Sequence, residues 1–207
     1  GAEATKLGYF EKEIVPIESK CESLKKSMIT MDEGIRYDSS IEALSSLKSV
    51  TDGGVITAGN ASQITDGASA IMVCNENGLS KIKCDPRAEI ISLSVIGDDP
   101  IFMLTGPIPA SKLALKNVNL SIDDIDLYEV NEAFAPVPLA WAHELKADHS
   151  KLNVNGGAIA LGHPLGSTGT KLMTTLLHEL ERRNGKYALQ AICEGGGTAN
   201  ATIIKKV

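Results

Sequence analysis

The chain has 207 residues, of which 43% are hydrophobic and 22% charged, and its formal net charge is −6. This length is enough for one large domain or for one domain with part of another. The composition is typical of an ordinary globular protein, and the mild acidity argues against nucleic-acid binding, which usually needs a basic surface. No apolar run is long enough to cross a bilayer, so we expect no membrane span.

The four cysteines predict neither a disulfide framework nor a metal site. They are Cys21, Cys74, Cys84 and Cys193. None belongs to a Cys-x-x-Cys pair, and no histidine follows at the spacing of a zinc ligand. Reduced thiols are typical of a cytosol-like compartment, and the N-terminus lacks the charged-then-apolar pattern of a secretion signal. We therefore expect a cytoplasmic protein without a bound metal.

The first 85 residues predict short elements joined by loops. Residues 1–10 have the pattern of the end of a helix, residues 13–17 that of a short extended segment, and residues 40–47 a helical apolar spacing. Small and polar residues crowd the segment 55–70, which suits a polar ligand chain lying against the protein. The compatible alternative is a loop leading into a buried strand over residues 70–73.

Beyond residue 85 strands and helices alternate, which predicts a layered α/β domain. The expected strands span residues 90–96, 125–130, 187–192 and 199–204, and the expected helices span residues 110–116, 132–145 and 168–183. We place a domain boundary after residue 85, inside a polar connection.

Three polar segments follow in this half of the chain, at the kind of position where open α/β sheets bind ligands. Asn131 follows one predicted strand, Cys193 follows another and precedes three glycines, and His163 lies in a glycine-rich loop over residues 156–169. Glycine lets a backbone approach a ligand closely, and histidine transfers protons near neutral pH. Each residue alone has a plainer interpretation, as a cap, a buried small side chain or an incidental loop residue. Together a thiol, an imidazole and an amide are the parts of a thioester-handling site.

In their order and spacing these motifs resemble the C-terminal half of a thiolase, the family of acetyl-CoA acetyltransferase and 3-ketoacyl-CoA thiolase. The segments that carry the resemblance are residues 55–70, 131–135, 154–169 and 193–197. It implies a thiolase-like layered α-β-α fold. Residues 1–85 would be the remainder of the N-terminal domain, including part of the CoA-binding loop domain. Residues 86–207 would be a nearly complete C-terminal domain with the element order βαβαβαββ.

The resemblance also implies an activity, either thiolytic cleavage of 3-ketoacyl-CoA or the reverse Claisen condensation of acetyl-CoA. His163 would take a proton from a nucleophilic cysteine and donate to the thioester oxygen, and Cys193 would be the second acid/base. Asn131 would hold a water at the oxyanion, and the N–H of Gly195 would complete a second oxyanion hole. The residues on the coenzyme A side would be Ser62, Ala133, Phe134 and Arg36.

The family's acylated nucleophile lies in its N-terminal half, which is outside this chain. Cys21, Cys74 and Cys84 lack the glycine-rich, small-residue context of such a nucleophile. We therefore expect a nucleophile-bearing N-terminal half as partner, on the same or a separate polypeptide, and a homo- or hetero-oligomer that covers apolar faces. The alternative function is a non-catalytic acyl-CoA-binding or scaffold subunit.

Two expectations concern charge at and around the site. Glycine amides beside Cys193 would stabilise its thiolate, whereas Glu194 would raise the pKa of the thiol if its carboxylate points inward. The remaining histidines are interpreted as surface or packing residues; they are His143, His149 and His178.

Overall fold

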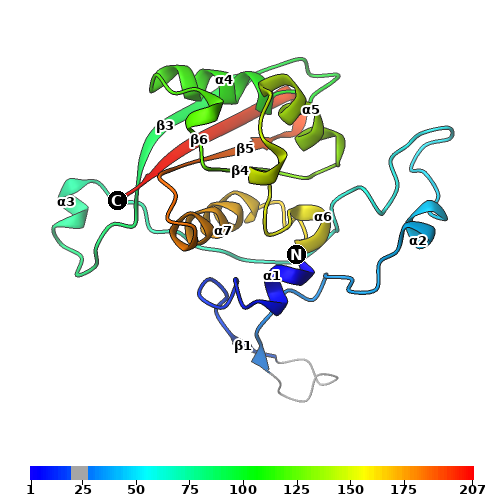
Figure 1. Cartoon of the computed structure of the whole chain (residues 1–207), viewed down its shortest axis with the longest axis horizontal. Coiled ribbons are helices and arrows are strands. Elements are labelled where there is room, and N and C mark those ends of the chain that lie inside the picture. The colour runs from blue at the N-terminus through cyan, green and yellow to red at the C-terminus, as the bar shows by residue number, and fades with distance from the viewer. Residues whose placement is uncertain (20–27) are drawn as a thin grey trace.

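A four-stranded sheet lies at the centre of the computed structural model, which describes residues 1–19 and 28–207 (Figure 1). In spatial order its strands are β3 (Ala88–Gly97), β6 (Thr198–Lys206), β5 (Tyr187–Cys193) and β4 (Leu127–Val130). The pairs β3–β6 and β6–β5 are antiparallel, whereas β5 and β4 run parallel. The carboxyl ends of β4 and β5 therefore lie at the same edge of the sheet.

Helices cover both faces of this sheet, which confirms the predicted α-β-α layering. On one face lie α4 (Pro107–Asn117) and α5 (Pro136–Leu145), and on the other lie α7 (Thr168–Arg182) and the short α6 (Ala158–Leu161) (Figure 1). The expected helix over residues 132–145 begins only at Pro136, because the residues before it turn away from the end of β4.

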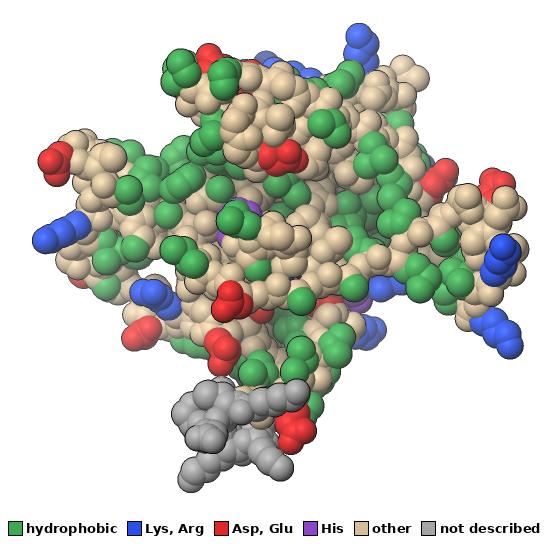
Figure 2. Space-filling model, turned by 180° about the vertical axis from the view of Figure 1, so that it is seen from behind, with side chains coloured by type: hydrophobic (Ala, Val, Ile, Leu, Met, Phe, Trp, Pro, Cys, Tyr) green, Lys and Arg blue, Asp and Glu red, His purple; other side chains and the backbone are tan. Residues whose placement is uncertain are grey.

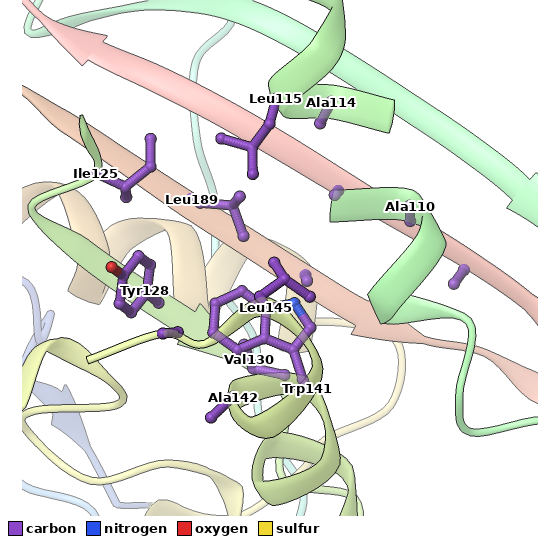
Figure 3. Close-up of a cluster of buried hydrophobic side chains, with 14 of the residues drawn as sticks. Ala110, Ala114, Leu115, Ile125, Tyr128, Val130, Trp141, Ala142, Leu145 and Leu189 are labelled. Carbon is purple, nitrogen blue, oxygen red and sulfur yellow. The ribbon is translucent and has the colours of Figure 1, made fainter. Parts of the chain in front are cut away.

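The larger core lies between the sheet and the helices α4 and α5 (Figure 3). The rings of Tyr128 and Trp141 pack with their centroids 5.2 Å apart. The indole nitrogen of Trp141 donates a hydrogen bond of 2.8 Å to Ser111, which joins α5 to α4. Ala110 and Ala114 are fully buried, and their small side chains let α4 lie close to the strands.

The second core lies under α7, whose apolar residues recur every fourth position. Leu176 and Leu180 are buried against Leu127 and Ala188 of the sheet. This period keeps the apolar residues on one helix face. The helix ends before Gly185, whose N–H bonds back to the carbonyl of Leu180, close to the predicted end at residue 183.

The remaining elements are short. They are α1 (Ala2–Lys6), β1 (Ile17–Glu18), β2 (Met28–Ile29), α2 (Ile41–Ser45), α3 (Glu76–Leu79) and single 3₁₀ turns at residues 122–124, 149–151 and 195–197. The segment around α1 packs through Ala4, Phe10 and Ile35 against Leu161, just ahead of His163. In contrast, α2 and α3 extend away from the sheet (Figure 1).

The prediction of a strand over residues 70–73 is wrong. These residues pair with no strand of the described ranges, and Met72 and Val73 are 73% and 71% exposed. An extended segment becomes a strand only when a neighbouring strand accepts its backbone hydrogen bonds.

The five-strand order βαβαβαββ is also wrong, because the described part of residues 86–207 holds four strands. Where another strand would flank β4, only Leu152 pairs with Tyr128, in a single parallel bridge. The side chain of Asn153 replaces the next ladder step: it accepts from the N–H of Val130 at 2.8 Å and donates to its carbonyl at 2.9 Å.

The molecule exposes much apolar surface (Figure 2). Its accessible area is 12670 Å², whereas a compact monomer of this length would expose about 9,000 Å². A hollow of about 1010 Å³ has a lining that includes Ile90 and Leu93 of β3, Ile204 of β6 and Leu177 of α7. None of the described helices is long and apolar enough to cross a membrane.

Candidate active site

Asn131 and Cys193 are positioned by the two parallel strands. In the β4–β5 register Val130 lies opposite Ala191, and the N–H of Asn131 donates to the carbonyl of Ala191 at 3.0 Å. Asn131 is 1% exposed and comes directly after β4, while Cys193 is the last residue of β5. Both predicted residues therefore lie at one edge of the sheet, on neighbouring strands.

His163 meets Asn131 at this edge. Its Nε2 atom lies 3.3 Å from the amide nitrogen of Asn131, and its Nδ1 atom lies 2.6 Å from the hydroxyl of Thr168. The ring is half-buried, and desolvation lowers the pKa of His163 below its ordinary value. The imidazole is therefore uncharged at neutral pH and can accept a proton.

Glu132 fixes the loop that presents His163. Its carboxylate accepts one hydrogen bond from the side chain of Asn153 at 2.9 Å and another from the N–H of Ile159 at 3.0 Å. Gly157 leaves room for this carboxylate, because a Cβ atom there would lie 2.3 Å from the Cδ atom of Glu132. Gly162 has φ +89°, a conformation that a residue with a side chain rarely adopts.

Two more side chains hold this loop from opposite sides. The side-chain amide of Gln63 donates to the backbone carbonyls of Ile159 and Ala160 at 3.0 and 3.3 Å. The backbone carbonyl of Gln63 accepts from the N–H of His163. Asn155, just before the loop, donates to Glu179 of α7 at 2.9 Å. The imidazole is thus presented by a loop tied to three other parts of the chain.

Sequence reasoning assigned no role to Glu132, Gln63 or Thr168. All three lie inside the motifs that pointed to the site, and motif membership was the only signal available. Their partners are separated from them in sequence or depend on the path of the loop, so the contacts become visible only in the fold.

Ser62, Ala133 and Phe134 are brought together beside this centre. The N–H of Ser62 donates to the carbonyl of Ala133 at 3.0 Å, and Ala61 and Phe134 form an antiparallel bridge. Phe134 remains partly exposed. The predicted coenzyme A segment around Ser62 thus lies against the segment that follows Asn131.

Arg36 is exposed, and among the described residues no hydrogen bond or ion pair joins its side chain to the other candidate residues. Its own stretch of chain does reach the site, because the carbonyl of Gly34 accepts from the amide of Gln63 at 2.9 Å.

Cys193 belongs to the apolar cluster under α4 and α5, and in the described ranges it makes no hydrogen bond to His163 or Asn131. Burial raises the pKa of the Cys193 thiol, with a smaller contribution from Glu194. Desolvation is the largest of these effects, so the pKa of the Cys193 thiol lies above its ordinary value. The carboxylate of Glu194 is exposed and accepts from Thr198 and Asn200, so it does not point inward.

Gly195 follows Cys193 in a tight turn over residues 195–197 that leads into β6. The turn is exposed at Gly195, and no atom lies within 4 Å of the position that a Cβ atom would take there. A reacting group could approach the backbone of Gly195 from this open side. A hollow of about 400 Å³ also lies between residues 65–69 and residues 164–167, which follow His163 in the chain.

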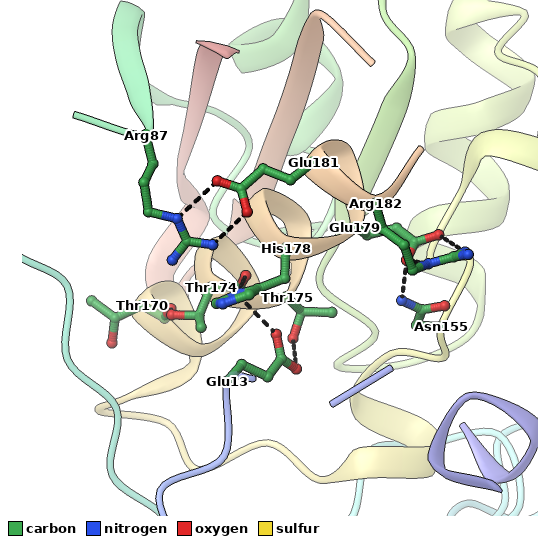
Figure 4. Close-up of polar contacts among 10 residues, drawn as sticks. All are labelled: Glu13, Arg87, Asn155, Thr170, Thr174, Thr175, His178, Glu179, Glu181 and Arg182. Atoms are coloured by element: carbon green, nitrogen blue, oxygen red, sulfur yellow. Dashed lines mark hydrogen bonds and ion pairs between the residues drawn. The ribbon is translucent and has the colours of Figure 1, made fainter. Parts of the chain in front are cut away.

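The other histidines and cysteines lie away from this centre. His143 and His149 are exposed, and Cys74 and Cys84 are exposed free thiols. His178 of α7 lies 3.5 Å from the carboxylate of Glu13, in a polar cluster on the outer side of the helix (Figure 4). Cys21 lies outside the described residues.

The chain matches two family models, the thiolase N-terminal domain over residues 1–77 and the thiolase C-terminal domain over residues 84–206. It belongs to the thiolase family. It is 52% identical over 204 residues to the steroid 3-ketoacyl-CoA thiolase FadA6 of Mycobacterium tuberculosis, covering 99% of this chain and 49% of that protein. It is 48% identical over 203 residues to the human mitochondrial 3-ketoacyl-CoA thiolase, covering 98% of this chain and 51% of that protein.

Solved thiolase structures agree with this assignment. The crystal structure of human mitochondrial 3-ketoacyl-CoA thiolase in complex with CoA matches with a TM-score of 0.90 and 45% identity, over 100% of this chain and 51% of that chain. The Bacillus anthracis acetyl-CoA acetyltransferase matches with a TM-score of 0.91 and 39% identity, over 100% and 52%. This thiolase chain spans about half the length of the curated relatives it matches.

Proposed function

We propose that this chain supplies the histidine, cysteine and asparagine of a CoA-dependent acyltransferase site. The reaction is thiolytic cleavage of 3-ketoacyl-CoA or the reverse Claisen condensation. The observation that carries the proposal is the contact between Asn131 and His163, at the same sheet edge as Cys193. The relatives named 3-ketoacyl-CoA thiolase, and the human structure with bound CoA, support this substrate class.

The protonation states of the two titrating groups suit these roles. Desolvation lowers the pKa of His163 and raises that of Cys193, so at neutral pH the imidazole is uncharged and the thiol keeps its proton. A general base must lack its proton and a general acid must hold one. His163 takes the proton of a nucleophilic cysteine, and Cys193 protonates the leaving group in cleavage. In condensation the reverse step applies, and Cys193 removes the α-proton of acetyl-CoA as the thiolate that cleavage leaves.

Asn131 and Gly195 stabilise negative charge on oxygen in this scheme. The Oδ1 atom of Asn131 is buried and has no hydrogen-bond partner among the described residues. A water bound there would donate one proton to this oxygen and turn its other proton toward the oxyanion. The exposed backbone N–H of Gly195 supplies a second donor site.

The coenzyme A side is formed by Ser62, Ala133 and Phe134. Backbone pairing holds these residues together next to Asn131, and the exposed edge of Phe134 offers an apolar wall for the pantetheine arm. Arg36 contributes a positive charge toward the phosphates of the coenzyme.

The acylated nucleophile comes from a thiolase N-terminal half, on the same or a separate polypeptide. Residues 1–85 continue that half and residues 86–207 form the C-terminal domain, a division supported by the family matches over residues 1–77 and 84–206. The large accessible area and the 1010 Å³ hollow support a further covering surface, whether from that half or from an oligomer. We place the protein in the cytoplasm.

The test joins this chain to the N-terminal half of the Mycobacterium tuberculosis relative and measures CoA-dependent loss of acetoacetyl-CoA. We expect turnover that falls by roughly 10²-fold or more in His163→Ala and in Cys193→Ala, while Cys74→Ser keeps full activity. Coenzyme A affinity, measured by calorimetry, should be unchanged in all three variants.

Turnover that is equal in Cys193→Ala and in the unaltered hybrid would contradict the proposal. Coenzyme A binding by a folded hybrid without any acyl transfer would instead favour the non-catalytic binding subunit.

A further inference from the structure

Thr168 is the first residue of α7 and is 2% exposed, so its hydroxyl is confined to partners inside the protein. It has two of them. The hydroxyl lies 2.9 Å from the carbonyl of Pro164 and 2.6 Å from Nδ1 of His163. We propose that Thr168 is a positioning residue that holds the neutral ring of His163 in the tautomer with its proton on Nδ1.

The direction of each hydrogen bond carries this inference. A threonine hydroxyl has one proton to donate, and a carbonyl oxygen can only accept. A threonine hydroxyl in a helix can donate to the carbonyl four residues earlier. Here this is the carbonyl of Pro164, which also accepts from the N–H groups of Ser167 and Thr168. With its proton so used, the hydroxyl faces Nδ1 as an acceptor, and Nδ1 must carry the hydrogen.

The other ring nitrogen agrees with this arrangement. With the proton on Nδ1, the Nε2 atom is a bare acceptor, and it faces the amide N–H₂ group of Asn131 at 3.3 Å. The bonds then run in one direction, from Asn131 through the ring of His163 and Thr168 to the carbonyl of Pro164. Each donor in this series has an acceptor.

The consequence rests on the proposed function. The base is Nε2, on the side of the ring that faces Asn131, and Thr168 acts on the reaction only through the imidazole. Without the hydroxyl, Nδ1 loses its acceptor and the ring is free to place its proton on Nε2, where it blocks proton uptake. General acid–base catalysis contributes roughly 10²–10⁴-fold in rate, and part of this factor depends on the correct tautomer.

The test is a long-range ¹H–¹⁵N correlation spectrum of the ¹⁵N-labelled 207-residue chain at pH 8, where His163 is neutral. His163→Gln identifies the ring signals by their loss. We expect Nδ1 of His163 to show the shift of a protonated ring nitrogen and Nε2 that of a bare one. Thr168→Ser should keep this pattern, and Thr168→Val should mix or reverse it. Thr174→Val is the matched control, because Thr174 lies on the same helix and its hydroxyl donates to the carbonyl of Thr170 rather than contacting His163.

A proton on Nε2 in the unaltered chain overturns the proposal, as does an unchanged pattern in a folded Thr168→Val. If Thr168→Val does not fold, the tautomer of the unaltered chain and of Thr168→Ser decides. The spectrum needs no acyl transfer, so an inactive hybrid with the expected tautomer counts against the proposed function alone. In an active hybrid, Thr168→Val should lower kcat about tenfold or more and leave KM unchanged.

Discussion

The amide nitrogen of Asn131 lies 3.3 Å from Nε2 of His163, and the two residues are 32 positions apart in the chain. One follows a buried strand and the other lies in a glycine-rich loop just before α7. Their contact depends on the loop keeping its path across the end of β4. Glu132 helps to hold that path, because it accepts hydrogen bonds both from Asn153 and from the backbone of Ile159.

The first prediction concerns the room for that carboxylate. In Gly157→Ala the new Cβ atom would lie 2.3 Å from Cδ of Glu132, so the carboxylate must move and release Ile159. We expect a loss of about 1–3 kcal/mol in the free energy of unfolding, measured by urea titration. Gly166→Ala is the control, since nothing lies within 4 Å of its Cβ position. Equal stabilities of the two variants would show that Glu132 does not crowd Gly157.

The second prediction concerns Glu13, whose side chain is 8% exposed (Figure 4). It accepts from Thr175 at 2.9 Å, and burial raises the pKa of Glu13 from 4.5 to about 7. The folded chain therefore holds this proton more tightly than the unfolded chain does. The resulting stability is complete below pH 4.5 and is lost as the pH rises through about 7. The groups that face Glu13 from α7 include His178 and Lys171.

Glu13→Gln should therefore gain stability relative to the unaltered chain between pH 5 and pH 8, as measured by urea unfolding at each pH. Glu11→Gln, at an exposed position in the same segment, should show no such trend. A Glu13→Gln difference that is the same at pH 5 and pH 8 would mean that Glu13 ionises normally in the folded chain.

The third prediction concerns the order in which the thiols react. Alkylating agents attack the thiolate, and burial raises the pKa of the Cys193 thiol while shielding it. At pH 7 we expect iodoacetamide to modify the exposed Cys74 and Cys84 before Cys193, as read by peptide mass spectrometry. Unfolding in urea should remove the difference. A Cys193 that reacts first in the folded chain would refute the burial of this thiol.

The fourth prediction concerns the core that positions the strand ends. Leu189 is fully buried in the cluster under α4 and α5, so Leu189→Ala should destabilise the chain by about 2–5 kcal/mol. Leu165→Ala, at a residue that is 82% exposed, should change stability by less than about 0.5 kcal/mol. Thermal unfolding monitored by circular dichroism measures both changes. A Leu189→Ala variant as stable as the unaltered chain would show that Leu189 does not lie in the main core.

Elements whose own residues bury a face were predictable from the sequence. The helix expected at residues 168–183 is found as Thr168–Arg182, because its leucines mark one face. Residues 70–73 have an equally apolar pattern and form no strand, because pairing depends on a neighbour that local sequence does not reveal. Next to β4, the side chain of Asn153 makes the bonds that another strand would make.

In the candidate site, too, local sequence predicted some features, while others depend on contacts between distant segments. The motifs pointed to Asn131, His163 and Cys193, and the fold places all three at one sheet edge. The sequence did not reveal that Thr168 and Glu132 hold the imidazole and its loop, since these contacts follow from the path of the chain. For Cys193 the sequence suggested two opposing effects on the pKa of the thiol, from glycine amides and from Glu194, but it did not reveal the burial that raises the pKa most.

The most direct test of the account locates the acyl group. The chain is mixed with a separately purified N-terminal half of the Mycobacterium tuberculosis relative and with acetoacetyl-CoA, and intact-mass and peptide spectra identify the acylated cysteine. The account predicts acylation on a cysteine of the N-terminal half that is strongly reduced with His163→Ala in this chain. Acylation of Cys193, Cys74 or Cys84, or labelling of the N-terminal half that does not depend on His163, would contradict it.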